Sequence, residues 1–184
     1  MAIIAQPVSQ PSNSVTSSVP HHGASDQFLR FHLFPDMTAV IPVEQLTEIL
    51  KVSLSQITPI PHLPEWITGI YNWRGEVLWM VDLGNLIGLT PWHQQENQSS
   101  KISVIVLDAC RQSEPTAISE SLPLGLIVNQ VEDIEWLTTD QLQSPSNSMI
   151  TDQLAPFLCG YWLSDDGEML TLLDGDAILD RMPT

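Results

Sequence analysis

The apolar runs of the chain are short, and this feature constrains its fold more than any other. Turn-forming residues interrupt the runs at intervals of roughly 8–12 residues, which leaves little room for long helices. The stretch FLRFHLF alternates, so one face of a strand would carry Phe28, Arg30 and His32. With 43% hydrophobic residues, the chain can fill a sizeable core. The sequence therefore predicts an all-β barrel or sandwich of about eight or more short strands.

The expected strands follow hydrophobic runs that are bounded by turn residues. They are 28–34, 38–43, 69–73, 76–83, 101–109, 123–137, 157–163 and 168–174. A few short helices complete the prediction. One should cover 82–89 with Asp82 as its N-cap, and the other should cover 175–182 with Asp174 in the same position. No internal repeat is evident in the sequence.

The segment 44–52 leaves two structures open. Leu46, Ile49 and Leu50 have helical spacing, but a strand with Leu46, Glu48 and Leu50 on one side fits equally well. The segment that follows it, ITPIPHLPEWITG, carries three prolines and should be an extended connector.

A single cation marks the turn between two apolar runs. Arg74 is the only Lys or Arg between Lys51 and Lys101. The stretch NWRG predicts a type I turn with Asn72 first and Gly75 last. A tryptophan beside an arginine is the composition of an interface hot spot, but packing of this indole onto the barrel explains it equally well.

The charge of the chain limits its partners. There are 22 acidic residues against 6 basic ones, a formal net charge of −16. Nucleic acid and anionic lipid surfaces need a basic footprint, so neither is expected as a partner. A basic protein partner fits this charge, and so does a role of the charge in solubility alone.

The sequence contains no pattern of a catalytic or metal site. It has no GxSxG, HExxH, Walker or GxGxxG motif, and its two cysteines do not form a CxxC pair. A β-barrel hydrolase would need two carboxylates with separated pKa values in one cleft, and no motif places two together. We therefore expect a protein that is not an enzyme and binds no cofactor or metal.

The start of the chain differs from the rest. Residues 1–25 are rich in Ser, Pro and Gln and lack apolar periodicity, which predicts a flexible tail before a domain at 26–184. No signal peptide and no run of roughly 18 apolar residues is present, so we expect a cytoplasmic protein without direct membrane insertion.

One long pattern resembles the CheW-like family of chemotaxis coupling proteins. The family pattern is I-P-x-x-P-x-x-I-x-G-x-x-N-x-R-G followed by D-L. It is matched by Ile60, Pro61, Pro64, Ile67, Gly69, Asn72, Arg74, Gly75, Asp82 and Leu83. Gly125, Val128 and Val131 match a second element, and Leu173-Asp174 a third. The resemblance covers roughly 28–180.

This resemblance implies a fold and a function. The family fold is two small five-stranded, SH3-like β-barrels around a shared hydrophobic core. The implied function is that of a non-catalytic adaptor. It would couple the tip of a methyl-accepting chemoreceptor to the regulatory domain of a CheA-type histidine kinase.

The resemblance also implies site residues. Arg74 would lie at the junction of the two barrels, held there through Glu48 or Asp82, with a direct partner contact as the second possibility. The partner-binding residues would be Leu46, Glu48, Tyr71, Trp73, Arg74 and Gly75.

The chain departs from the family pattern in its tail, its acidic surplus, the segments 110–122 and 138–156, and Trp73 in place of an aliphatic residue. These departures leave two further readings open. The module could serve a type IV pilus or phototaxis system, or it could sequester or inhibit a kinase.

Overall fold

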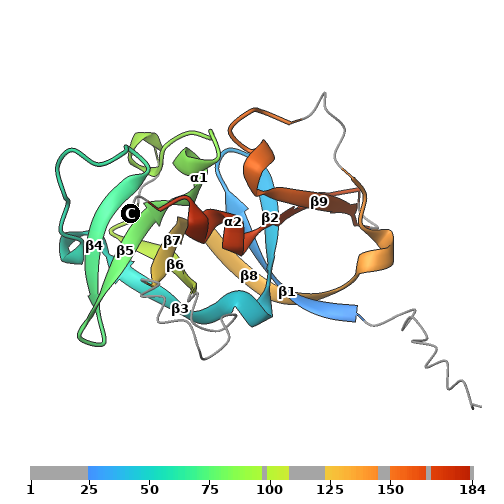
Figure 1. Cartoon of the computed structure of the whole chain (residues 1–184), viewed down its shortest axis with the longest axis horizontal. Coiled ribbons are helices and arrows are strands. Elements are labelled where there is room, and N and C mark those ends of the chain that lie inside the picture. Colours follow the sequence, from blue (N-terminus) through green and yellow to red (C-terminus); the bar gives the residue numbers. More distant parts are fainter. Residues whose placement is uncertain (1–24, 97–98, 108–122, 145–149, 165–166, 183–184) are drawn as a thin grey trace, which may run out of the picture.

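The computed structural model describes residues 25–96, 99–107, 123–144, 150–164 and 167–182. Ten strands form two five-stranded sheets, which occupy the two halves of the molecule (Figure 1). Residues 1–24 of the expected tail and the whole 110–122 segment lie outside the described residues. Strand β1 includes Ser25, three residues before the predicted start at Phe28.

The first sheet has the strand order β8-β1-β2-β10-β9. Its strands are β1 (Ser25–Leu33), β2 (Met37–Pro42), β8 (Gln130–Thr138), β9 (Leu158–Leu163) and β10 (Met169–Leu173). Neighbouring strands are antiparallel except β2 and β10, which are parallel. The first and last of the described strands, β1 and β10, therefore belong to the same sheet, with β2 between them.

The second sheet has the order β3-β6-β7-β5-β4. Its strands are β3 (Leu46–Ser53), β4 (Ile67–Trp73), β5 (Glu76–Asp82), β6 (Lys101–Leu107) and β7 (Leu124–Val128). Here β5 and β7 form the parallel pair, and the other neighbours are antiparallel. The two sheets thus share one pattern of strand directions.

The connectivity repeats although the sequence shows no repeat. A hairpin, β1–β2, precedes a strand in the other sheet, β3, and then the hairpin β4–β5 and the short helix α1 (Leu83–Leu86). The same order recurs as β6–β7, β8, β9–β10 and the helix α2 (Gly175–Asp180). Each half of the chain therefore contributes strands to both sheets.

In each sheet, the segment that follows one edge strand pairs with the opposite edge strand and so curves the sheet toward a barrel. Thr58, after β3, exchanges backbone hydrogen bonds with Ile70 of β4 at 2.8 and 2.9 Å. Gln143, after β8, does the same with Tyr161 of β9. This closure makes the five-stranded sheets barrel-like, in agreement with the expected SH3-like architecture.

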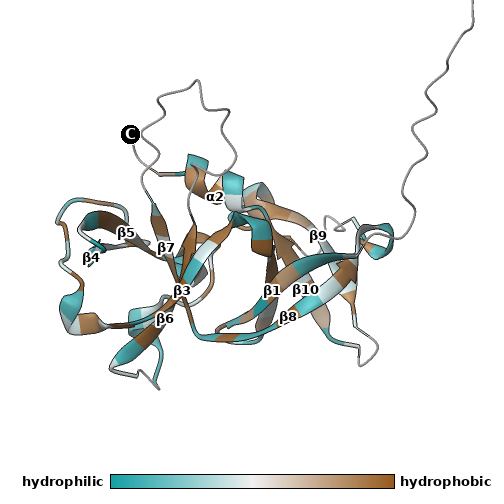
Figure 2. Cartoon of the chain, turned by 90° about the horizontal axis from the view of Figure 1, so that it is seen from below, coloured by the Kyte–Doolittle hydropathy of each residue, from teal (hydrophilic) through white to brown (hydrophobic). Residues whose placement is uncertain are grey.

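A shared core lies between the sheets, as predicted. Leu29 and Phe31 of the first sheet pack in one buried cluster with Ile105 and Leu126 of the second. Each sheet also encloses a smaller cluster of its own. Hydrophobic residues run along the strands of both halves, shown in brown in Figure 2. The burial of these alternating faces stabilises each sheet and joins the two.

The structure decides between the two alternatives for one segment and corrects the prediction for another. The segment 44–52 is extended, with a 3₁₀ turn at Val43–Gln45 before β3. The stretch 123–137 is not one strand: it divides at Asn129, and β7 and β8 belong to different sheets. Asn129 donates its backbone N–H to His32 O and accepts from Phe34 N through Oδ1, which holds this crossing point.

Both predicted helices are present, and both are capped as expected. Asp82 accepts from Asn85 N, and Asp174 accepts from Asp176 N and Ala177 N. Leu83 and Ile178 on these helices fill the shared core. Within the described residues, no helix is long and apolar enough to cross a membrane.

Candidate functional site

Arg74 lies in a two-residue loop between β4 and β5. The strands pair up to Trp73 and Glu76, so only Arg74 and Gly75 connect them. Both have positive φ, 56° and 89°. The predicted type I turn over 72–75 is therefore wrong, because positive φ at both central residues is the type I′ pattern, which matches the twist of paired strands. Asn72 supports the loop by accepting from Gly75 N.

One carboxylate oxygen accepts from Trp73, the last residue of β4, and from Arg74 in the loop. Glu48 Oε2 accepts from the indole Nε1 of Trp73 at 2.9 Å and from an Arg74 guanidinium nitrogen at 2.9 Å. The guanidinium carbon also lies 5.1 Å from the centre of the Trp73 ring, a cation–π contact. We call these three residues the closing cluster.

The closing cluster joins the two edges of the second sheet. Glu48 is on β3 and Trp73 is at the end of β4, and these are the outermost strands. Glu48 points to the barrel interior because β3 alternates and Leu50 and Val52 share that face with the second sheet's own core. The Arg74–Glu48 pair considered from the sequence is present, and it lies within the second sheet; the predicted place of Arg74 at the junction of the barrels stays a prediction.

Exposure separates Trp73 from the two loop residues that follow it. Trp73 is only 8% exposed and belongs to the core of the second sheet, so packing of its indole onto the barrel is confirmed and an exposed hot spot at Trp73 is wrong. The Arg74 side chain keeps 67% of its surface exposed. Gly75 is exposed, and no atom lies within 4 Å of the position that a Cβ would take there.

The remaining predicted partner-binding residues differ in position. Tyr71 is half-buried against the core of the second sheet. Leu46 is 9% exposed and packs in the shared core, and its role in partner binding stays a prediction. A bulge between Leu46 and Glu48 in the pairing with β6 puts Leu46 on the face toward the other sheet.

Asp82 does not pair with Arg74, contrary to the alternative pairing considered from the sequence. Its carboxylate accepts from Asn85 N at 3.1 Å and from Trp92 N at 2.6 Å. Burial raises the pKa of Asp82, and the backbone hydrogen bonds oppose that rise. Asp82 caps α1, and Leu83 of this helix packs in the shared core. The role of Asp82 at the junction of the sheets stays a prediction.

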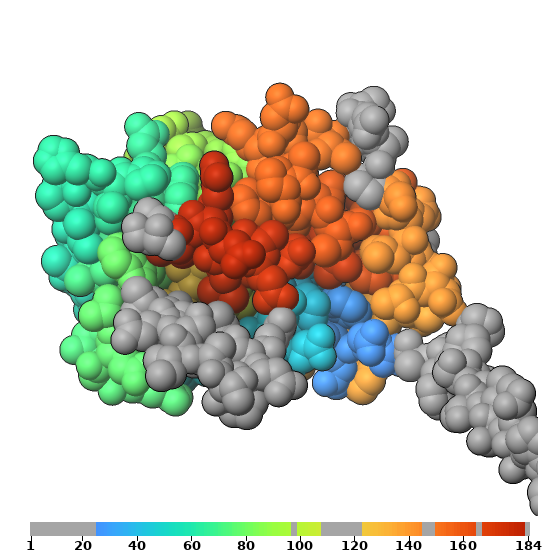
Figure 3. Space-filling view, viewed as in Figure 1, coloured from blue at the N-terminus to red at the C-terminus, as the bar shows by residue number. Residues whose placement is uncertain are grey.

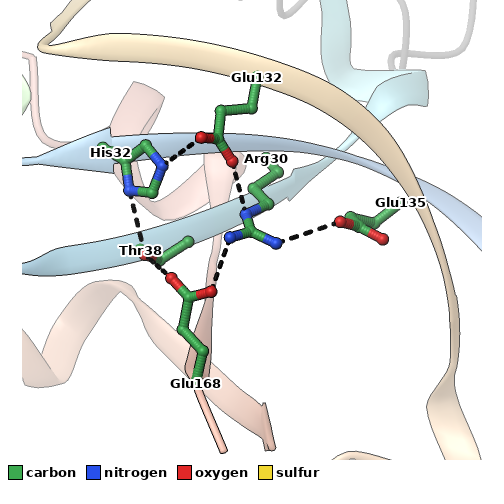
Figure 4. Close-up of polar contacts among 6 residues, drawn as sticks. All are labelled: Arg30, His32, Thr38, Glu132, Glu135 and Glu168. Carbon is green, nitrogen blue, oxygen red and sulfur yellow. Dashed lines mark hydrogen bonds and ion pairs between the residues drawn. The ribbon is translucent and has the colours of Figure 1, made fainter. Parts of the chain in front are cut away.

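A second polar network, which the sequence did not reveal, lies in the first sheet (Figure 4). Arg30 on β1 contacts three carboxylates: Glu132 at 2.8 Å, Glu135 at 3.3 Å and Glu168 at 2.6 Å. Its Nε reaches Glu132 as an ion pair but outside hydrogen-bond alignment. Arg30 thereby ties the edge strand β8 to the start of β10. The signal in the sequence was the alternation of Arg30 and His32 among buried residues.

His32 and Thr38 complete this network. Thr38 donates to Glu168 Oε1 and lies 3.1 Å from His32 Nδ1, while His32 Nε2 lies 2.7 Å from Glu132. A hydroxyl has one hydrogen, so while Thr38 donates to Glu168 its oxygen can still accept from His32 Nδ1. The hydrogen bond from Thr38 lowers the pKa of Glu168, as does the charge of Arg30.

These arrangements suit structure and recognition. In the part of the chain that the structure describes, no three His, Cys, Asp or Glu side chains are grouped closely enough to hold a metal ion.

Comparisons with known proteins agree with this architecture. A chain from Rhizobium etli described as a probable chemotaxis protein CheW is 28% identical over 124 residues, 67% of this chain and 70% of the relative. The chemotaxis protein CheW of Thermotoga maritima is 24% identical and covers 72% and 76% of the two chains.

A solved structure shares the fold. The scaffolding protein TtCheW from Thermoanaerobacter tengcongensis superposes with a TM-score of 0.64 at 23% identity, covering 82% of this chain and 89% of that one. The model of the CheW-like domain matches residues 27–182, nearly all of the predicted domain. The chain therefore belongs to the CheW-like domain family, whose members are non-enzymatic scaffold and adaptor proteins.

Proposed function

We propose that this chain couples methyl-accepting chemoreceptors to a CheA-type histidine kinase as a cytoplasmic adaptor. The observation that carries the proposal is Arg74, which is fixed in place and yet exposed. Glu48 and the Trp73 ring hold the guanidinium at the tip of the β4–β5 hairpin. Most of its surface still faces solvent.

An exposed, positioned guanidinium suits recognition of a partner. It carries five N–H donors in a planar fork, and its described contacts use one of them. The remaining donors can bind a carboxylate or carbonyl of a second protein with little loss of side-chain freedom. Glu48, Tyr71 and Gly75 would form the rest of this surface around Arg74.

Binding of the purified chain to the regulatory domain of a CheA-type kinase from the same organism tests the proposal. We expect saturable binding that falls by about tenfold or more in Arg74→Ala, the loss typical of a hot-spot residue. Arg181→Ala is the matched control, since Arg181 is also exposed and the change in net charge is the same. Equal binding by both variants would remove Arg74 from the interface.

Absence of binding by the wild type, with its circular dichroism spectrum intact, would overturn coupling to this kinase. A kinase that binds the chain and then ignores its receptors would indicate sequestration instead.

Pilus-based motility is the finer form of the proposal. It is supported by the departures from the family pattern, above all the tail and the acidic surplus. A deletion strain that twitches and responds to light normally would exclude this form and leave flagellar chemotaxis.

A further inference from the structure

A second surface lies on the opposite sheet from Arg74. It is an open groove of about 620 Å³ at the start of β1. Its lining residues include Phe28 and Leu172, which are buried. Pro42, Val43 and Glu44 line one side, and Trp136 and Thr139 of the β8 end line the other. Figure 3 shows the start of β1 in blue between the cyan residues after β2 and the orange residues that follow β8.

Trp136 is the most exposed large hydrophobic residue of the described chain, at 63%. It lies opposite Gln27, and Ile134 lies opposite Leu29, so Trp136 and the exposed Ile134 share one face of β8. This strand is at the edge of its sheet. An exposed tryptophan that lines a groove together with apolar residues is typical of an interface anchor.

The charges of the groove define the chemistry of its occupant. Asp26 and Glu44 are both exposed lining residues, and none of the lining residues that the structure describes is basic. Among the described residues, no ion pair involves either carboxylate. The two charges are therefore available to a cationic partner.

We propose that this groove binds a protein segment that combines lysine or arginine with large apolar side chains. The apolar side chains would pack against Trp136 and the other apolar lining residues, and the cations would meet Asp26 and Glu44. This surface is independent of the proposed role of Arg74, and it gives an adaptor a place for a further partner.

Nuclear magnetic resonance of the full-length ¹⁵N-labelled chain can test the proposal with three hexapeptides, which alternate Lys and Leu, Lys and Ser, or Glu and Leu. The loss of one indole signal in Trp136→Phe assigns the Trp136 resonance. We expect the Lys–Leu peptide to shift this signal saturably, and we expect binding of the other two peptides to be weaker by about tenfold, since each lacks one half of the recognition.

Variants locate the binding. Two changes in the groove should each weaken binding of the Lys–Leu peptide by about fivefold or more. They are Trp136→Ala and the double variant Asp26→Asn with Glu44→Gln. Glu76→Gln, an exposed carboxylate in the other sheet, should leave binding unchanged. The Arg74→Ala variant should also bind the Lys–Leu peptide normally. A failure of the proposed kinase coupling would therefore not affect the outcome of this experiment.

Several outcomes would overturn the proposal. Equal binding of the Lys–Ser peptide would mean that charge alone is recognised. Shifts outside the groove, or no shift with any peptide, would remove the site. Movement of the Trp136 signal when the protein alone is concentrated would assign the groove to a second copy of the chain.

Discussion

At the residue scale, the candidate site depends on Glu48. Its Oε2 is shared by a buried donor, Trp73 Nε1, and by an exposed one, the Arg74 guanidinium. A buried donor without an acceptor destabilises the fold strongly, whereas an exposed ion pair contributes little. Glu48 and Trp73 therefore stabilise the barrel, and Arg74 can be changed with little effect on folding.

This division predicts unequal losses of stability. We expect Glu48→Ala to lower the free energy of unfolding by about 1–3 kcal/mol, because the Trp73 indole loses its acceptor. Arg74→Ala should cost only about 0–1 kcal/mol, as for other exposed ion pairs. Urea unfolding measures both, with Glu48→Gln as the control that keeps an acceptor. An Arg74→Ala loss as large as that of Glu48→Ala would contradict this account.

A pH effect is expected at Glu168. Thr38 and Arg30 lower the pKa of this carboxylate in the folded state. A lowered folded pKa contributes stability above the pKa of the unfolded chain, and that contribution is lost as the pH falls through the folded pKa. Carboxyl ¹³C titration should place Glu168 below the usual glutamate range and Thr38→Val should move it back toward that range. An unchanged titration in Thr38→Val would assign the shift to another cause.

At the element scale, the hairpins combine predictable and unpredictable features. The β4–β5 strands and the helix caps of Asp82 and Asp174 followed from local patterns of apolar, turn and capping residues. The turn type did not, because the strand twist selects a conformation with positive φ even at Arg74, a residue that rarely adopts it.

Tertiary packing limits what the sequence can predict of the elements and the site. The break at Asn129 could not be read from LIVNQVEDI, since both sides of it look like strand. The burial of Leu46 and Trp73 depends on a bulge and on a neighbour 25 residues away. The network of Arg30 joins residues more than 100 positions apart, which no local pattern could indicate.

Glycine positions test the closure of the second barrel. A Cβ at Gly69 would lie 2.3 Å from the carbonyl oxygen of Thr58, in the backbone pairing that closes the sheet. A Cβ at Gly75 would meet nothing, although its φ of +89° disfavours a side chain. We expect Gly75→Ala to cost about 1–2 kcal/mol from backbone conformation alone. Gly69→Ala should lower the free energy of unfolding clearly more than Gly75→Ala does, as measured by denaturant unfolding. Equal losses in the two variants would argue against tight closure at Thr58.

At the scale of the whole molecule, each half of the chain supplies strands to both sheets. The sheets also share the core around Phe31 and Ile105. Neither barrel can be completed by one continuous segment, so we expect one cooperative unfolding transition. Far-ultraviolet circular dichroism and tryptophan fluorescence, which reports on Trp73 in one barrel and Trp162 in the other, should give coincident curves. Two separated transitions would mean that the barrels fold independently.

Receptor-dependent phosphorylation by the kinase tests the central claim most directly. Autophosphorylation of a CheA-type kinase would be measured with membranes that carry its methyl-accepting receptor, with and without the chain. We predict that the wild-type chain raises kinase activity only when the receptor is present, and that Arg74→Ala does so far less than Arg181→Ala. Activity that stays unchanged, or that falls in proportion to the added chain, would contradict the coupling role.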